Sequence, residues 1–391
     1  PRSAPSNSVK LTNIQLSASF SIAQIEQSNR SFYPASSLLP VSHAVDKYTF
    51  CYNSTDQTGR TIPITAQFFV PKAEAGERPL YVFGQGTTGL GDNCAPSKEN
   101  VAAASWGNYQ AHMLSYAAQG YIVMFPDYEG FNDPARLHHY FNAELEARVL
   151  LDGARAAYAF FDTQSATVAP AQAVFFAGYS QGGHAAFAAA DLHQSYAPEL
   201  PVKGVISYAG TTNMVNLLKE NAPLAPYLAQ AYRDFYGPQA VDPAQLFTPA
   251  VLTNFVADVT SICIDRIYRR YGYDARAIYA PPFYDALYNN KLAQRYPAFK
   301  KVLDQNNSGL SKSTVPALIL QGSTDTVVTV ASQTDFLRQR CAAGAHANYT
   351  EYPGVNHYQT RQVSFKDSLS WMQAVQAGDV PASACASQAR P

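Results

Sequence analysis

Short, nearly uninterrupted apolar runs recur along the chain, and each is followed by a longer segment with helical spacing. Such runs are typical of parallel strands buried on both faces, and the longer segments are typical of crossover helices. The predicted strands lie at 79–86, 121–128, 173–179, 203–210, 315–322 and 347–354. The predicted helices lie at 99–119, 136–161, 182–196, 331–341 and 362–377. We therefore expect an α/β fold, with a mostly parallel sheet and helices on both of its faces.

Two further features define the limits of this sheet. The stretch 61–71 alternates apolar and polar residues, which predicts an antiparallel edge pair upstream of the parallel strands. Between the fourth and fifth predicted strands lie about 100 residues, whereas an ordinary crossover needs about a dozen or more. We therefore expect an α/β core formed by residues 1–210 and 315–391, with a helical cap or lid inserted at 211–314. A separate domain with an unrelated role is the alternative.

Charge and hydropathy exclude several kinds of partner. A formal net charge of -1 over 391 residues gives no electrostatic reason to expect nucleic acid or an anionic membrane surface. No apolar run approaches the roughly 18–20 residues that a spanning helix needs, so we expect no integral membrane association. The chain begins at PRSAPSNSVK without a methionine, which indicates a processed mature form or a chain trimmed for expression.

The chain has five cysteines, and none has the spacing of a zinc site, so we expect no metal. An odd number allows two disulfides and one free thiol. Cys385 lies in a tail without a core-forming pattern, which a disulfide would anchor. Cys51 lies in the strand-like stretch YTFCYN and is consistent with a buried, reduced thiol.

GYSQGGH at 178–184 is the first motif that carries chemistry. Gly178 and Gly182 flank Ser180 in a G-x-S-x-G pattern, between a predicted strand and a predicted helix. At the carboxyl end of a strand in an α/β sheet such a turn is tight and lifts the serine hydroxyl clear of the sheet. The flanking glycines are needed because strand and helix approach too closely for side chains. Ser180 is therefore the candidate nucleophile, and a glycine-eased turn without chemistry is the alternative.

A serine nucleophile needs a base and a carboxylate that orients the base, which follow the serine along the chain as Asp or Glu and then His. Asp325 follows the strand VPALILQG, and His357 follows the last predicted strand. Both occupy strand ends in the required order, so they are the candidate acid and base. Asp325 could instead be a turn residue that caps the next helix, and His357 could be a loop histidine without a role.

Other polar residues near these motifs are weaker candidates. His184 lies one turn along the helix from Ser180, so its side chain is expected to point along the helix. His138 and His139 are adjacent on a predicted helix and would face different directions, which disfavours a metal pair. Asp127 ends a strand but precedes the serine, so we expect it to be structural.

A tetrahedral intermediate needs about two N–H donors for its oxyanion. The amide of Gln181 is the first candidate, since it follows the nucleophile at a helix N-terminus. The glycine-rich loop at 84–89 is expected to supply the second donor, from Thr87 or, failing that, Thr88. A flexible surface loop is the alternative interpretation of this segment.

These residues together resemble the secretory lipases of the lipase-A type, which are capped α/β-hydrolases. The resemblance rests on GYSQGG at 178–183, QGSTDTVV around Asp325, GVNH ending at His357, and DNCAPS at 92–97. It covers roughly residues 30–378, and DNCAPS is its most family-specific element. GQGTTG at 84–89 departs from the acidic loop of the yeast members and is more like the His-Gly-x-x-Gly loops of other esterases.

The resemblance implies a secreted (extracellular or periplasmic) enzyme that hydrolyses acyl esters without a cofactor, with a lid shaped by the insert. It also implies disulfides that join Cys94 with Cys263 and Cys341 with Cys385. We expect a monomer that acts on a small-molecule or lipid-like ester.

Two other functions remain compatible with the sequence. A serine aminopeptidase of the same fold would need an acidic anchor for the substrate's amino group, and the insert offers Asp234, Asp258, Asp265, Asp274 and Asp285. A hydrolase fold used only for binding is the second, although such proteins usually lose a member of the triad.

Overall fold

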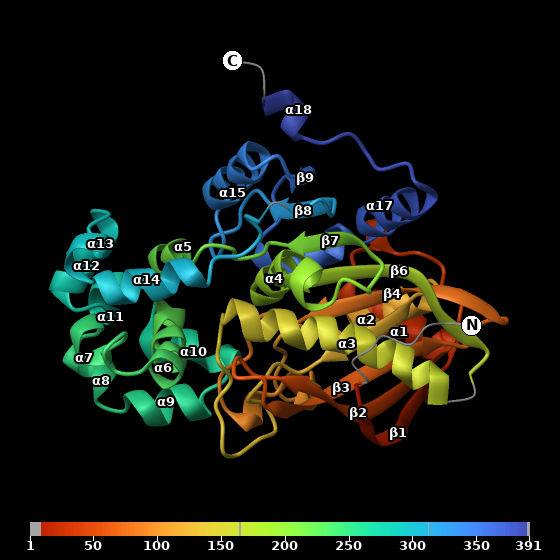
Figure 1. Cartoon of the computed structure of the whole chain (residues 1–391), viewed down its shortest axis with the longest axis horizontal. Helices are drawn as coiled ribbons and strands as arrows, with labels where there is room; N and C mark the ends of the chain where they lie inside the picture. The colour runs from red at the N-terminus through yellow and green to blue at the C-terminus, as the bar shows by residue number, and fades with distance from the viewer. Residues whose placement is uncertain (1–8, 164–165, 312, 389–391) are drawn as a thin grey trace.

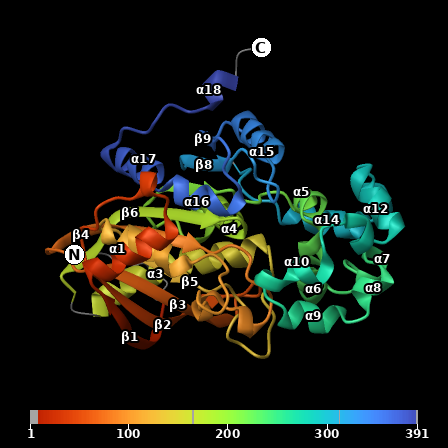
Figure 2. The ribbon, with the colours of Figure 1, turned by 180° about the vertical axis from the view of Figure 1, so that it is seen from behind.

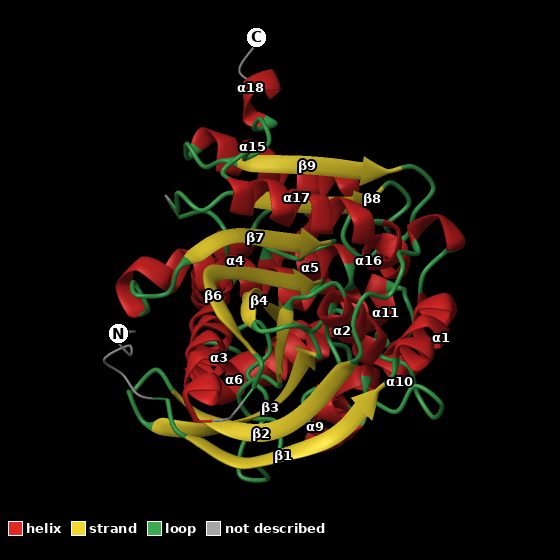
Figure 3. Ribbon diagram, turned by 90° about the vertical axis from the view of Figure 1, so that its right-hand side faces the viewer, coloured by secondary structure: helices red, strands yellow, loops and turns green. Residues whose placement is uncertain are grey.

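The computed structural model of the chain describes residues 9–163, 166–311 and 313–388. Within these ranges a sheet of nine strands has the order β1-β2-β3-β5-β4-β6-β7-β8-β9 (Figure 3). The strands are β1 Leu11–Phe20, β2 Val45–Thr55, β3 Thr61–Pro71, β4 Gly76–Gly84, β5 Ile122–Pro126, β6 Val168–Tyr179, β7 Val202–Tyr208, β8 Ala317–Gly322 and β9 Ala347–Tyr352. The pairs from β5 through β4 to β9 are parallel, while β1, β2, β3 and β5 pair antiparallel. The predicted α/β class with a mostly parallel sheet is confirmed.

Helices cover both faces of this sheet. One face packs against α1 (Ile22–Phe32), α2 (Tyr109–Ala118) and α17 (Phe365–Ala377). The other packs against α3 (Ala143–Thr163), α4 (Gln181–Tyr196) and α15 (Val330–Ala342). Because side chains of a strand alternate between the faces, β6 sends Phe175 into the first core and Phe176 into the second. The sheet is therefore buried on both sides, as its apolar strands require.

The helix predicted at 99–119 is wrong in its first half. Residues before Tyr109 form a turn around the side chain of Glu99, which accepts hydrogen bonds from the amides of Trp106, Gly107, Asn108 and Tyr109. A carboxylate that holds four successive amides keeps them out of a helical ladder, so α2 begins only at Tyr109.

The helix predicted at 136–161 also begins later, at Ala143. Phe141 has a left-handed backbone with φ 54°, which no helix continues. The side chain of Asn142 then accepts a hydrogen bond from the amide of Leu145 at 3.1 Å, and this caps the new helix. His138 and His139 consequently lie in the loop before α3 rather than on a helix.

The chain between β7 and β8 is helical and forms a separate hydrophobic cluster. Its helices are α5 Met214–Glu220, α6 Ala225–Tyr236, α7 Pro243–Leu246, α8 Pro249–Leu252, α9 Phe255–Ser261, α10 Ile264–Tyr271, α11 Ala275–Ile278, α12 Pro281–Tyr288, α13 Leu292–Arg295 and α14 Pro297–Gln305. Figures 1 and 2 show them gathered beyond one end of the sheet, next to the point at which β7 leads into α5. Leu90, Tyr140 and Phe141 of the surrounding chain join their cluster.

The C-terminal part of the chain adds α16 (Thr360–Val363) and the short helix α18 (Cys385–Gln388). In the described residues no helix combines the length and the apolar character required to cross a bilayer.

Candidate active site

Ser180 occupies a tight turn between β6 and α4, with φ 55° and ψ -113°. The flanking glycines are required by space: a Cβ on Gly178 would lie 1.9 Å from the carbonyl oxygen of Gly182. A Cβ on Gly182 would in turn lie 1.9 Å from the carbonyl oxygen of Gly84, which ends β4. The Ser180 amide donates to the Tyr208 carbonyl at 3.0 Å, which ties the turn to the end of β7. The strained turn that the sequence pattern predicts is therefore present.

Asp325 and His357 lie in contact at the carboxyl ends of two neighbouring strands, β8 and β9. Asp325 Oδ1 accepts the amides of Val327 and Val328, each at 2.8 Å, and so fixes its own turn. The other oxygen, Oδ2, accepts a hydrogen bond from His357 Nδ1 at 2.8 Å. Asp325 is thus a turn residue and a histidine partner at once, and both side chains are buried. A carboxylate at Nδ1 fixes the imidazole tautomer and leaves Nε2 to face the site.

The imidazole of His357 also packs beside the serine turn. Its ring centroid is 4.9 Å from that of Tyr179, the residue immediately before Ser180. Among the described residues, His357 Nε2 has no hydrogen-bond partner within the protein, so it is the nitrogen that could exchange a proton.

The glycine-rich loop after β4 also lies beside the serine turn. Thr87 is 8% exposed, and its hydroxyl shares a hydrogen bond of 2.7 Å with the hydroxyl of Tyr140. The Thr88 carbonyl accepts the amide of Ile264 at 2.9 Å, which joins this loop to α10. Within the described chain the amides of Thr87 and Thr88 donate no hydrogen bond, so both remain available to a ligand.

Gln181 begins α4, so its amide is one of the unpaired donors at a helix N-terminus. Its side chain points the other way, into a buried polar cluster that the sequence analysis missed. The side-chain nitrogen lies 2.7 Å from Glu146 Oε1 and 2.8 Å from His138 Nε2. The only signal in the sequence was a glutamate within the apolar stretch LEARVLL, which on a helix packed against a sheet must find a partner.

The weaker histidine and aspartate candidates have structural partners. His184 is fully buried, with Nδ1 2.6 Å from Glu146 Oε2 and Nε2 2.7 Å from the Asn306 carbonyl. Asp127 accepts hydrogen bonds from the amide and hydroxyl of Ser97 and from the Asn132 amide group. Burial raises the pKa of Asp127 to about 6 against these hydrogen bonds. Neither residue faces Ser180 through a free polar atom.

His138 and His139 lie in a loop rather than on the predicted helix, and both rings contact Glu129. His138 stacks between aromatic rings and donates from Nδ1 to the Glu129 carbonyl at 3.0 Å. His139 lies between two carboxylates, with Nδ1 2.8 Å from Glu129 Oε2 and Nε2 3.1 Å from Asp234 Oδ2. In the described ranges no three His, Cys, Asp or Glu side chains are grouped so that they could hold a metal ion.

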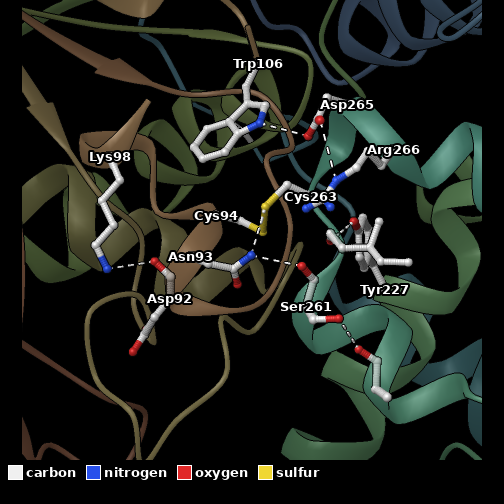
Figure 4. Close-up of a disulfide and its surroundings, with 12 residues drawn as sticks. Asp92, Asn93, Cys94, Lys98, Trp106, Tyr227, Ser261, Cys263, Asp265 and Arg266 are labelled. Carbon is white, nitrogen blue, oxygen red and sulfur yellow. Dashed lines mark hydrogen bonds and ion pairs between the residues drawn. A yellow bond between two sulfur atoms is a disulfide. The ribbon is translucent and has the colours of Figure 1, made fainter. Parts of the chain in front are cut away.

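A disulfide between Cys94 and Cys263 joins the segment after the glycine-rich loop to the start of α10 (Figure 4). Asn93 donates from its side chain to the Ser261 carbonyl at 2.9 Å, and Trp106 donates to Asp265 at 3.1 Å on the other side of the bridge. The second disulfide, Cys341–Cys385, attaches the C-terminal α18 to α15. Cys51 is a free thiol in β2.

Most of the acidic residues named as possible amine anchors are engaged elsewhere. Asp234 pairs with His139, Asp258 with Arg270 and Asp265 with Trp106. Asp274 caps α11, and Asp285 is exposed on α12. The structure therefore gives no specific support for an aminopeptidase.

The sequence profile of the secretory lipase family matches residues 108–384, which is most of the chain. The chain belongs to the secretory lipase family. A secreted triacylglycerol lipase, LIP4 of Malassezia globosa, is 26% identical over 356 residues that cover 86% of this chain and 73% of the relative. This family member is accordingly a secreted carboxylic ester hydrolase.

Solved structures show the same fold. The rice cell wall degrading esterase LipA of Xanthomonas oryzae superimposes with a TM-score of 0.74 at 18% identity, over 95% of this chain and 97% of that chain. Candida antarctica lipase A in its closed state gives a TM-score of 0.66 at 18% identity, over 94% and 83%. At this level of identity the likeness establishes the α/β-hydrolase fold alone.

Proposed function

We propose that the enzyme cleaves acyl esters through an acyl-enzyme on Ser180, with His357 as base and Asp325 as its orienting carboxylate. The observation that carries this proposal is the 2.8 Å hydrogen bond from His357 Nδ1 to Asp325 Oδ2, made beside the strained serine turn. A serine hydroxyl alone is a weak nucleophile, and an imidazole held in this tautomer can take its proton through Nε2.

The reaction then follows from the positions of the groups. His357 takes the hydroxyl proton as Ser180 attacks the ester carbonyl, and the resulting oxyanion lies against the amides of Gln181 and Thr87. His357 returns the proton to the leaving alkoxide, and the alcohol departs. Water repeats the sequence on the acyl-enzyme and releases the acid. Asp325 remains ionised and stabilises the imidazolium in both steps.

We propose further that residues 211–314 form a cap over the site, on a core of residues 1–210 and 315–391. The separate hydrophobic cluster of α5–α14 supports this division, and so does their position beyond one end of the sheet. Ser180, His357 and Asp325 are each less than a tenth exposed, which fits a site covered from above. The triacylglycerol lipase among the relatives favours lipid-like esters as substrates.

The test is Ser180→Ala, with p-nitrophenyl butyrate as substrate. We expect kcat to fall by about 10⁴-fold or more, since loss of a triad serine leaves only binding and oxyanion stabilisation. Ser195→Ala is the matched control, because Ser195 lies exposed on the same helix and bonds only the Leu192 carbonyl. Retention of most of the activity by S180A would refute the proposal.

A fluorophosphonate probe gives an independent measurement. It should label the wild-type enzyme on the peptide that contains Ser180, and it should not label S180A. Labelling elsewhere with full loss of activity would assign the nucleophile to another residue. A series of p-nitrophenyl esters from acetate to palmitate, with and without an emulsion, would then measure the preferred acyl length.

A further inference from the structure

The loop that leads into α3 contacts both residues proposed to stabilise the oxyanion. The hydroxyl of Tyr140 shares a hydrogen bond of 2.7 Å with that of Thr87, and His138 Nε2 lies 2.8 Å from the side-chain nitrogen of Gln181. Both tyrosine and histidine are at least 98% buried. A single short segment therefore reaches the two loops that carry the proposed donors.

Glu146, in the first turn of α3, completes the attachment of Gln181. It is 1% exposed, and its Oε1 accepts the Gln181 side-chain nitrogen at 2.7 Å and the Phe141 amide at 3.1 Å. Its Oε2 lies 2.6 Å from Nδ1 of His184, which is one turn along α4 from Ser180. The carboxylate thus joins the nucleophile's helix to the left-handed turn at Phe141.

The hydrogen atoms of this cluster can be assigned from its acceptors. His138 Nδ1 faces the Glu129 carbonyl at 3.0 Å, so it carries the hydrogen and Nε2 is the acceptor. Burial lowers the pKa of His138 to about 3, in agreement with a neutral ring. The Gln181 side-chain nitrogen then donates one hydrogen to His138 and the other to Glu146. Both of its donors are used, and the side chain is held in one orientation.

We propose that Glu146, assisted by His138, is a positioning residue that aims the Gln181 amide at the oxyanion. The direction of this amide is set by the peptide plane between Ser180 and Gln181, at the strained turn. A side chain anchored at its far end by two buried acceptors restricts rotation of that plane. The inference rests on the proposed function, because it assumes that Ser180 forms the tetrahedral intermediate and that Gln181 meets its charge.

The first test is Glu146→Met, which keeps the length of the side chain and removes its acceptors. Loss of one oxyanion donor costs about 10²–10³-fold in kcat, so a donor that is present but misdirected should cost about tenfold or more. KM should stay within about threefold, since the ester is held mainly by other contacts. The inhibition constant of a trifluoromethyl ketone, which forms a tetrahedral adduct on the serine, should rise by the same factor as kcat/KM falls.

Asp152→Asn is the matched control. Asp152 is a buried carboxylate on the same helix, but it bonds Ser54, Tyr196 and Arg155 rather than the serine turn. This variant should lower the melting temperature and leave kcat within about twofold. A loss of kcat in D152N equal to that in E146M would overturn the proposal, since it would show a general effect of destabilising α3.

Glu146→Gln distinguishes positioning from charge. Its amide oxygen can still accept from Gln181 and Phe141, while its N–H₂ can donate to Nδ1 of His184. That histidine keeps its hydrogen on Nε2, which faces the Asn306 carbonyl at 2.7 Å. E146Q should therefore recover most of the kcat that E146M loses. If E146Q is as slow as E146M, hydrogen bonding to Gln181 is not the role of this residue.

Gln181→Met is a second variant that tests the proposal even if E146M does not fold. It removes the anchored amide group, keeps the backbone N–H, and should reproduce the fall in kcat with an unchanged KM. A kcat within twofold of wild type in Q181M would overturn the inference. S180A distinguishes a failure of the proposed function from a failure of the positioning role. If S180A stays active, the proposed function fails. If S180A is inactive and Q181M is fully active, only the positioning role is refuted.

Discussion

Two buried carboxylate–histidine pairs lie near Ser180, and they differ in what the second ring nitrogen meets. His357 Nδ1 is 2.8 Å from Asp325 Oδ2, and His184 Nδ1 is 2.6 Å from Glu146 Oε2. His184 Nε2 then faces a carbonyl, that of Asn306, at 2.7 Å. His357 Nε2 has no such partner in the described part of the chain, and the ring packs against Tyr179, the residue before Ser180.

This difference separates a histidine that can transfer a proton from one that holds the structure together. Both nitrogens of His184 already lie within hydrogen-bond distance of protein oxygens, so neither is free to face Ser180. His357 has one nitrogen fixed and one free, which is the arrangement that a general base needs. Two carboxylate–histidine pairs thus take different roles because of one carbonyl group, that of Asn306.

The largest expected effect comes from removing the proposed base. His357→Gln should lower kcat/KM by about 10⁴-fold, since Ser180 then has no group to take its proton. The free energy of unfolding should fall by no more than about 2 kcal/mol, because Asp325 keeps the two backbone amides that fix its turn. Hydrolysis of p-nitrophenyl butyrate and urea unfolding measure the two quantities.

The control for this variant is His43→Gln, which changes a histidine beside Gly120. It should leave kcat/KM within about twofold. A fall of less than tenfold in H357Q would show that another group serves as base, and His184 would be the first to examine.

Removal of His184 should lower the stability of the protein more than its activity. His184→Leu leaves the Glu146 carboxylate buried without the partner of its Oε2, and breaking a buried pair in this way costs about 3–5 kcal/mol. We expect kcat, measured at a temperature where the variant is folded, to fall by less than tenfold. Urea unfolding followed by circular dichroism gives the stability. An H184L enzyme as inactive as H357Q would contradict the distinction between the two pairs.

The Asp325–His357 pair could be predicted from the sequence, and the Glu146–His184 pair could not. Asp325 and His357 follow apolar strands, and parallel strands bring their carboxyl ends to one edge, so the order along the chain predicted that they would be close. The pairing of Glu146 with His184 depends on how α3 packs against α4. No periodicity in the sequence specifies that contact.

The errors in the predicted helices also come from contacts that the periodicity of the sequence does not specify. Apolar spacing extended both α2 and α3 toward their N-termini, and it was overruled by single side chains. Glu99 holds a run of four amides in a turn, and Asn142 caps α3 after the left-handed Phe141. Such bonds between a side chain and the backbone change the local structure without changing the hydrophobic pattern. His138 was therefore assigned to a helix, and its contact with Gln181 could not be foreseen.

A third histidine, His139, also pairs with a carboxylate, but its pair with Asp234 is partly open to solvent. Burial lowers the pKa of His139, but its hydrogen bonds to Asp234 and Glu129 outweigh this and raise the pKa to about 9. Asp234 belongs to α6, and its side chain is 47% exposed, so this ion pair joins the helical insert to the loop before α3 at the surface. A histidine whose pKa is raised in the folded protein stabilises it fully below the unfolded pKa of about 6.5, and the contribution disappears as the pH rises through 9.

Asp234→Asn should therefore have the smallest effect, and one that depends on pH. At pH 6 the variant should be less stable than the wild type by about 1 kcal/mol or less, since an exposed carboxylate is screened by solvent. At pH 9.5 most of the His139 rings are neutral in both proteins, so the difference between their melting temperatures should become much smaller. Asp304→Asn is the control, because Asp304 pairs with Lys300 and its contribution does not follow an imidazole titration. A difference between D234N and the wild type that is equal at both pH values would show that His139 is uncharged throughout, and that burial outweighs its two carboxylates.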